Sequence, residues 1–150
     1  MCKLSAQDVA NYFLSLPDEE AGDSISNLKL QKLCYYAQGF HLAFFDKPLF
    51  DDQIEAWQHG PVIRHLYHKY KEHGALGIPA IKKFDLSIYS KKVHELLDEI
   101  YKLYGQYSAL RLSQFTHLEP PWKEAYERGA GLISHKSMKD YFKTLIVKND

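Results

Sequence analysis

Residues 26–45 restrict the fold of this 150-residue sequence more than any other stretch. Apolar residues recur there every three or four positions, which is the period of an α-helix. They cover most sides of that helix: Leu28, Leu30, Leu33, Cys34, Tyr35, Tyr36, Ala37, Phe40, Leu42, Ala43 and Phe44. A helix that is apolar on most sides is buried on most sides, so we expect it at the centre of the fold. Gly39 costs this helix about 1 kcal/mol relative to alanine, and the close approach of a neighbouring helix would explain the glycine.

Serine residues mark the starts of other expected helices. Ser5 to Asp8 matches a capping box, in which two side chains satisfy free backbone N–H groups at the helix start. Pro17 then stops the apolar stripe that follows. Ser90 and Ser108 precede two further amphipathic runs, and Ser137 to Asp140 matches a second capping box before the last helix. Together these signals predict six or seven helices, with the buried helix among them at the centre.

The segment around residues 53–62 suggests a small amount of β-structure. Gln53 to Trp57 alternates polar and apolar residues, which is the period of a strand, and Ile81 to Phe84 is a second candidate strand. Pro61, directly after Gly60, fits the first position of a helix, where its missing N–H needs no partner. We therefore expect a mainly α fold, one compact domain over residues 1–150, with at most a small two-stranded β ribbon.

Charge and cysteine content argue against several classes of protein. The 19 Lys and Arg residues balance 19 Asp and Glu residues, whereas nucleic-acid-binding domains are usually basic. No apolar run approaches the about 20 residues that cross a bilayer, and the N-terminus lacks the apolar stretch of a secretory signal. Cys2 and Cys34 are too few for a disulfide framework or a four-cysteine zinc site, and we expect Cys34 to pack as a small hydrophobe. These features predict a cytoplasmic protein that uses no membrane, metal or cofactor.

Histidine and carboxylate residues leave an enzymatic interpretation open. The eight histidines include no His-Glu-x-x-His pattern, and His65 and His68 fit a solvated helix face. His117 and Glu119 could supply a base and an orienting carboxylate, with His59 as a third group, in a small hydrolase or nuclease. The same side chains could instead satisfy free backbone groups where a helix ends. The enzymatic interpretation requires them to converge in one cleft.

A nucleic-acid-binding regulator is a second alternative. It requires a continuous positive stripe, for which the candidates are Arg64, Lys69, Lys71, Lys82 and Lys83. Its binding would weaken steeply as salt is added.

The 11 tyrosines and 8 phenylalanines exceed what one core face absorbs. The surplus consists of Tyr12, Tyr35 or Tyr36, Tyr67, Tyr89 and Tyr126. Tyrosine is favoured in protein–protein contacts, because its rigid ring buries a large area while its hydroxyl keeps a hydrogen bond. RNA stacking also uses exposed rings, but it normally comes with a basic groove. Protein binding is therefore the function that this surplus favours.

Three blocks of the sequence resemble one known family. They are Leu28-Lys29-Leu30-Gln31-Lys32-Leu33-Cys34-Tyr35-Tyr36-Ala37-Gln38-Gly39, Glu55-Ala56-Trp57-Gln58-His59-Gly60-Pro61-Val62, and Leu112-Ser113-Gln114-Phe115-Thr116-His117 with Pro121-Trp122 downstream. In this order and spacing they resemble the Panacea domain of SocA-like antitoxins and phage-associated GepA-type proteins, over roughly residues 5–145. The family has no established catalytic motif, so the resemblance implies that the chain is not an enzyme.

The resemblance also implies partners and motif positions. It implies a helical antitoxin that neutralises a cognate toxin by binding it, and some members are thought to hand the toxin to an ATP-dependent protease. A homodimer would be compatible with this function. The expected protein-binding or motif residues are Lys32, Tyr36, Gln38, Trp57, His59, Gly60, Pro61, Tyr67, Thr116, His117, Glu119 and Trp122. We expect the binding anchors near residues 57–70 and 117–126.

Overall fold

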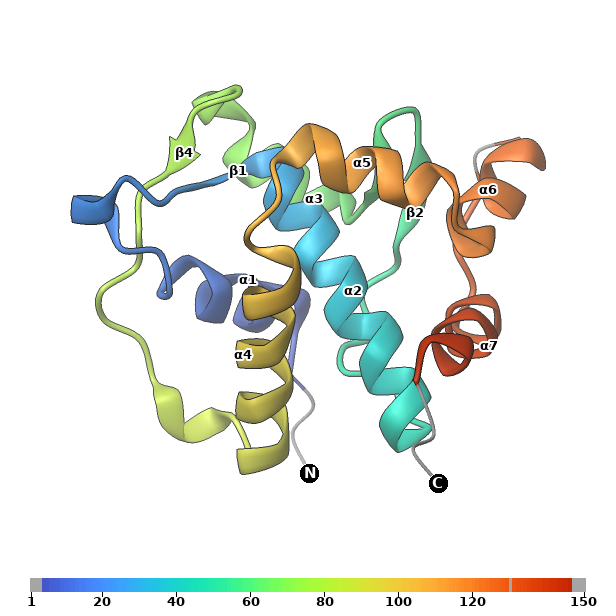
Figure 1. The fold of residues 1–150 in the computed structure, drawn as a ribbon, viewed down its shortest axis with the longest axis horizontal. Coiled ribbons are helices and arrows are strands. Elements are labelled where there is room, and N and C mark those ends of the chain that lie inside the picture. The colour runs from blue at the N-terminus through green and yellow to red at the C-terminus, as the bar shows by residue number, and fades with distance from the viewer. Residues whose placement is uncertain (1–3, 130, 147–150) are drawn as a thin grey trace.

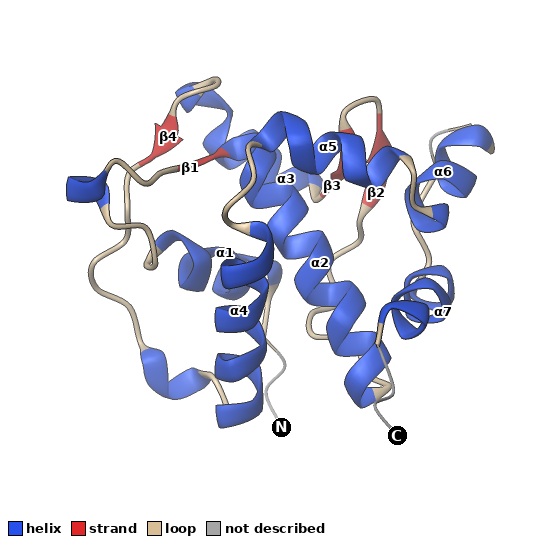
Figure 2. Cartoon of the chain, viewed as in Figure 1, coloured by secondary structure: helices blue, strands red, loops and turns tan. Residues whose placement is uncertain are grey.

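A computed structural model describes residues 4–129 and 131–146 of the chain. Helices dominate this part of the molecule, as Figure 2 shows. Its seven α-helices are α1 (Ala6–Leu14), α2 (Asn27–Phe45), α3 (Arg64–Tyr70), α4 (Lys91–Tyr104), α5 (Ala109–His117), α6 (Pro120–Glu127) and α7 (His135–Leu145). Short 3₁₀ turns, η1 (Glu19–Ala21), η2 (Lys71–His73) and η3 (Leu86–Ile88), lie between them. The prediction of a mainly α fold is confirmed.

Helix α2 is the central element of the fold, as its all-round apolar pattern predicts. It runs through the middle of the molecule and contacts α1, α3, α4, α5 and α7 (Figure 1). The side chains of residues 30–37 are all fully buried. Gly39 faces α7, where a Cβ would overlap the ring of Phe142. This close approach is the explanation that the sequence suggested for a glycine inside the helix.

Most helix starts follow from their capping residues. Ser5 forms the predicted capping box with Asp8, and Ser90 and Ser108 cap α4 and α5 through their side chains. The prediction for the last helix is wrong: Ser134, not Ser137, caps α7, and its Oγ accepts from the backbone N–H of Ser137. A serine three residues ahead of the expected cap begins the helix one turn earlier.

Pro61 occupies a strand, contrary to the prediction of a helix start. Strand β2 (Glu55–Trp57) pairs antiparallel with β3 (Gly60–Val62), and Pro61 lies opposite Ala56. Helix α3 begins only at Arg64. Pro61 is tolerated because a short two-stranded ribbon leaves one side of each strand without a ladder partner. The predicted ribbon is therefore a hairpin whose turn is Gln58 and His59.

A second ribbon joins β1 (Ile25–Ser26) to β4 (Gly77–Ile78). The candidate strand over residues 81–84 is wrong, since that segment is loop in the structure. Each strand of the second ribbon is two residues long and carries no alternating pattern that a sequence could reveal.

Cys34 is fully buried in the core, and burial raises the pKa of its thiol. Its placement confirms the prediction that it packs as a small hydrophobe. Within residues 4–129 and 131–146, the structure contains no helix with the length and hydropathy of a membrane span.

Candidate functional site

The turn of the β2–β3 hairpin is fixed by side chains of α5 and α6. The carbonyls of residues 57, 58 and 59 accept, in that order, from Trp122 Nε1 (2.7 Å), His117 Nε2 (2.9 Å) and Ser113 Oγ (2.6 Å). Three consecutive carbonyls are therefore satisfied by three side chains of one helical corner. This arrangement gives the hairpin a fixed position on the molecule.

Gly60 brings the hairpin close to helix α2. Its φ of +120° is a conformation that favours glycine. A Cβ at this position would lie 2.7 Å from Lys32 Cε and 2.8 Å from Thr116 Oγ1. Lys32 and Thr116 thus fill the space that a side chain on residue 60 would need.

Lys32 is fully buried beneath the hairpin. Its Nζ is the one buried side-chain polar atom, among those described, that has no hydrogen-bond partner. Burial lowers the pKa of Lys32 from 10.5 to about 7. An amine in this position loses water without gaining a partner, which is an unfavourable environment for its charged form.

Glu119, between α5 and α6, is buried against the same helix but has partners. Its Oε1 accepts from Tyr35 (3.0 Å) and its Oε2 from Tyr36 (2.8 Å). Burial raises the pKa of Glu119 from 4.5 to about 7, and the two tyrosine hydrogen bonds act against this rise. The carboxylate therefore ties the α5–α6 junction to α2.

The acid–base residues proposed for an enzyme do not form one hydrogen-bonded group. Glu119 bonds to tyrosines of α2, whereas His117 donates to the hairpin turn. The side chain of His59 is exposed and has no partner among the described residues. Nor does any group of three or more His, Cys, Asp or Glu within residues 4–129 and 131–146 have an arrangement that could hold a metal ion. Three of the polar side chains in this region, Ser113, His117 and Trp122, instead donate hydrogen bonds to backbone carbonyls of the hairpin turn.

Aromatic rings gather at the hairpin and α6; Trp122 is buried there and the others are partly exposed. Trp57 packs edge-on against Tyr67, with ring centroids 4.9 Å apart. The Trp122 ring stacks on Tyr126 (4.6 Å between centroids) and is tilted against His117 (4.3 Å). Tyr126 is 39% exposed, and Trp57, Tyr67 and His117 are half-buried. This row of rings is close to the region in which the sequence places binding anchors.

Most of the other tyrosines in the predicted surface surplus are core residues. Tyr12, Tyr35, Tyr36 and Tyr89 are at most 6% exposed, so assigning them to a surface was wrong. Each ring packs in the core and each hydroxyl has a hydrogen-bond partner. Tyr12, for example, donates to Asp98, and Tyr89 donates to the carbonyl of Asp8. Only Tyr67 and Tyr126 of that surplus reach the surface.

The structure brings eight of the predicted site residues together at the hairpin and its support: Lys32, Trp57, His59, Gly60, Pro61, Thr116, His117 and Trp122. Tyr67 packs against one of them, Trp57. Pro61 is buried in β3, and Tyr36 lies in the core with Glu119. Gln38 lies elsewhere in the core, where its side chain bonds to the backbone of Leu49 and Phe50. Lys32, Tyr36 and Gln38 are therefore buried residues that do not contribute to the surface of this structure.

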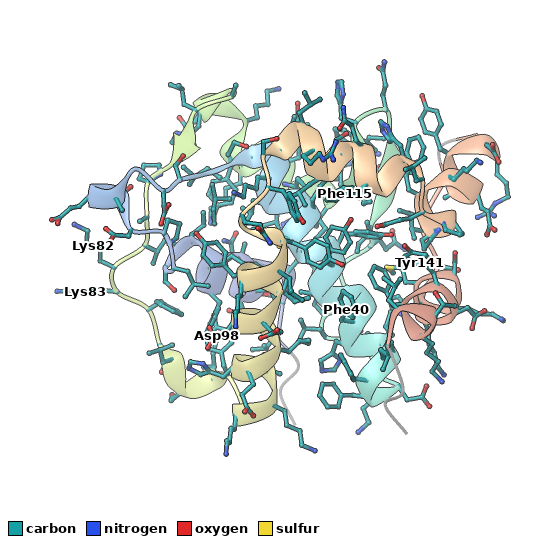
Figure 3. All side chains as sticks on the ribbon, in the orientation of Figure 1. Phe40, Lys82, Lys83, Asp98, Phe115 and Tyr141 are labelled. Atoms are coloured by element: carbon teal, nitrogen blue, oxygen red, sulfur yellow. The ribbon has the colours of Figure 1, made fainter. Side chains whose placement is uncertain are left out.

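Two of the basic residues proposed for a nucleic-acid-binding stripe, Arg64 and Lys82, lie beside acidic side chains. Arg64 is paired with Glu55 at 2.9 Å. Lys82 lines a cavity together with Asp18, Glu19, Glu20 and Asp98. Figure 3 shows Lys82 and Lys83 at the edge of the molecule away from α6. Acidic side chains thus interrupt the proposed stripe.

The sequence did not predict the three side-chain hydrogen bonds that hold the hairpin turn, which we call the clamp. Nor did it predict that the buried Nζ of Lys32 has no hydrogen-bond partner among the described residues. The clamp could not be read locally, because its donors and acceptors are more than 50 residues apart in the chain. Lys32 did carry a signal. It is a lysine inside a helix that is apolar all round, so its side chain had no polar face to occupy.

Comparisons with known proteins identify the family of this chain. A family model described as "Antitoxin SocA-like, Panacea domain" matches residues 30–123, which include most of α2, the hairpin, α5 and the start of α6. The chain is also 35% identical to Antitoxin SocA of Caulobacter vibrioides (strain NA1000 / CB15N), in an alignment that covers 93% of this chain and 83% of that protein. No solved structure matches the chain significantly. The family match and the relative together show that the chain belongs to the SocA-like antitoxin family with a Panacea domain.

Proposed function

We propose that this protein neutralises a cognate toxin by binding it directly, with no chemical turnover. The observation that carries the proposal is the family match over residues 30–123, together with 35% identity to a protein named as an antitoxin. Binding alone is sufficient for neutralisation. A complex with a Kd of about 1 nM corresponds to about −12 kcal/mol, which a standard interface of about 1,600 Å² can provide with a few well-buried aromatic anchors.

The fixed surface around the hairpin supports this proposal. Trp57, Tyr67 and Tyr126 are aromatic residues of the kind that dominates protein interfaces, and Leu118, which follows α5, is 82% exposed. A surface whose backbone is held by three side-chain hydrogen bonds loses little freedom when a partner binds. The separate hydrogen-bonding roles of His117 and Glu119 also favour binding over catalysis.

Co-expression with the protein encoded by the neighbouring reading frame tests the function. We expect the neighbour to arrest growth when expressed alone, growth to recover with this chain, and the two proteins to co-purify. A neighbour that is harmless and does not co-purify would contradict the proposal. The same experiment in a host without the relevant ATP-dependent protease separates masking from delivery: rescue that persists there favours masking alone.

A further inference from the structure

A cavity of about 420 Å³ lies between the β2–β3 hairpin, the start of α2 and the α3–η2 segment; we call it the hairpin pocket. Its walls are largely apolar or aromatic and include Leu28, Trp57, Val62 and Tyr67. The volume is within the about 300–1,000 Å³ typical of ligand pockets. It is large enough for a side chain of a partner protein to enter.

The rim of the hairpin pocket carries polar side chains that are not engaged elsewhere. Gln58, His59 and Lys71 are exposed, and none of them bonds through its side chain to another described residue. Lys71 is the one residue lining the pocket that carries a formal charge when histidine is neutral. The pocket therefore combines an apolar interior with a single cation at its edge.

The walls of the pocket are held in place from both sides. On one side the carbonyls of residues 57–59 are bound by α5 and α6. On the other, Asn27 Nδ2 donates to the carbonyl of Tyr67 (3.0 Å), which links α2 to α3. A preformed pocket binds with less loss of conformational entropy than one that must be ordered.

The charge of the pocket distinguishes it from a second cavity, between α1, the residues after it and α4. That cavity, of about 710 Å³, has four carboxylates around one lysine and would repel an acidic group. The hairpin pocket has the opposite preference. An apolar wall ending at an ammonium group fits a side chain that has an aliphatic stem and a terminal carboxylate.

We propose that the hairpin pocket is the part of the toxin interface that receives an aspartate or glutamate side chain of the toxin, paired with Lys71. This inference rests on the proposed function and names the chemistry of its partner. The aliphatic stem contacts Trp57 and Tyr67, and the carboxylate reaches the ammonium group at the rim. Gln58 is placed to donate a further hydrogen bond from its amide.

Affinity measurements with the co-purified neighbouring-frame protein test the inference. We expect Lys71→Glu to weaken binding at least tenfold and Lys71→Met to weaken it less. Ala75→Phe, which adds bulk at the pocket without removing a contact, should also weaken binding at least tenfold. Lys102→Glu is the matched control, because it makes the same charge change at an exposed position on α4 outside the pocket. Added salt should weaken the wild-type complex more than the Lys71→Met complex.

The outcomes separate the two proposals. Wild-type affinity in both Lys71→Glu and Ala75→Phe, with each variant folded by circular dichroism, would overturn the pocket while leaving the antitoxin function intact. An equal loss in Lys102→Glu would also overturn it, since that result shows long-range steering in place of local pairing. If the wild-type chain itself neither binds nor rescues, the proposed function fails, and the pocket proposal fails with it.

Discussion

Two ionisable side chains are buried at helix α2, and they differ in whether their polar atoms have hydrogen-bond partners. Glu119 is buried against Tyr35 and Tyr36 and accepts a hydrogen bond from each. Lys32, one turn earlier on the helix, is buried without any partner among the described residues. Burial moves both pKa values to about 7. The comparison shows that the same degree of burial can hold a structure together or work against it, depending on whether the polar atoms are satisfied.

Removing the partnered group should have the largest effect. Glu119→Ala leaves two buried tyrosine hydroxyls without their acceptor and opens a cavity at the α5–α6 junction. We expect it to lower the free energy of unfolding by about 3–5 kcal/mol, because each unsatisfied hydroxyl costs about 1–3 kcal/mol and the cavity adds to this cost. Urea denaturation at pH 5, below the raised pKa of Glu119, measures this change.

Glu124→Ala is the control for that experiment, because Glu124 lies on α6 and is exposed. Its effect should stay within about 0.5 kcal/mol. If Glu119→Ala lowers the free energy of unfolding by less than about 1 kcal/mol, the tyrosine hydrogen bonds contribute little. Glu119 and Lys32 would then not differ in their effect on stability as proposed.

Removing the unpartnered group should have the opposite sign. Lys32→Met keeps the length of the side chain and eliminates the buried amine, so we expect a gain of about 1–4 kcal/mol in the free energy of unfolding. Lys123→Met, at an exposed position of α6, is the matched control and should change little. A destabilised Lys32→Met protein would show that the amine has a favourable interaction after all.

The two groups also predict an unusual dependence of stability on pH. The pKa of Glu119 is raised on folding, so its contribution is complete below pH 4.5 and is lost as the pH rises to about 7. The pKa of Lys32 is lowered on folding, so stability rises again as the pH increases from about 7 towards 10.5. Unfolding free energies measured between pH 5 and pH 9 should therefore pass through a minimum near pH 7, with each limb no steeper than about 1.4 kcal/mol per pH unit.

Variants separate the limbs of that curve. Glu119→Gln should flatten the acidic limb, and Lys32→Met the alkaline one. A curve in Lys32→Met that keeps its alkaline limb would assign that limb to another group.

Features that depend on neighbouring residues in the sequence were predictable, whereas features that depend on distant residues were not. Helix α2, its glycine contact and the caps at Ser5, Ser90 and Ser108 follow from spacings of a few residues, and all of them were predictable. The hairpin position of Pro61 depends on pairing with Ala56 and was missed.

Long-range partners explain the rest of what was missed. More than 80 residues separate Glu119 from its two tyrosines, so no local sequence pattern predicts their hydrogen bonds. For the same reason the tyrosine surplus pointed to a surface when most of those rings complete the core. The blocks that resemble the family include Lys32, Thr116 and His117, which the structure places at the hairpin, but they do not indicate which of these side chains are exposed.

The smallest expected effect tests whether the two tyrosines share the carboxylate equally. Tyr36→Phe removes the shorter of the two hydrogen bonds to Glu119 and should cost about 1–2 kcal/mol. Because that hydrogen bond holds the pKa of Glu119 down, its loss should raise the pKa of the carboxyl further above its usual value. Carbon-13 NMR titration of the Glu119 carboxyl reports this shift directly, and Tyr35→Phe is the matched variant on the other oxygen. If Tyr36→Phe leaves that pKa unchanged while Tyr35→Phe raises it, the carboxylate is held from one side only, and the difference between Glu119 and Lys32 rests on a single hydroxyl.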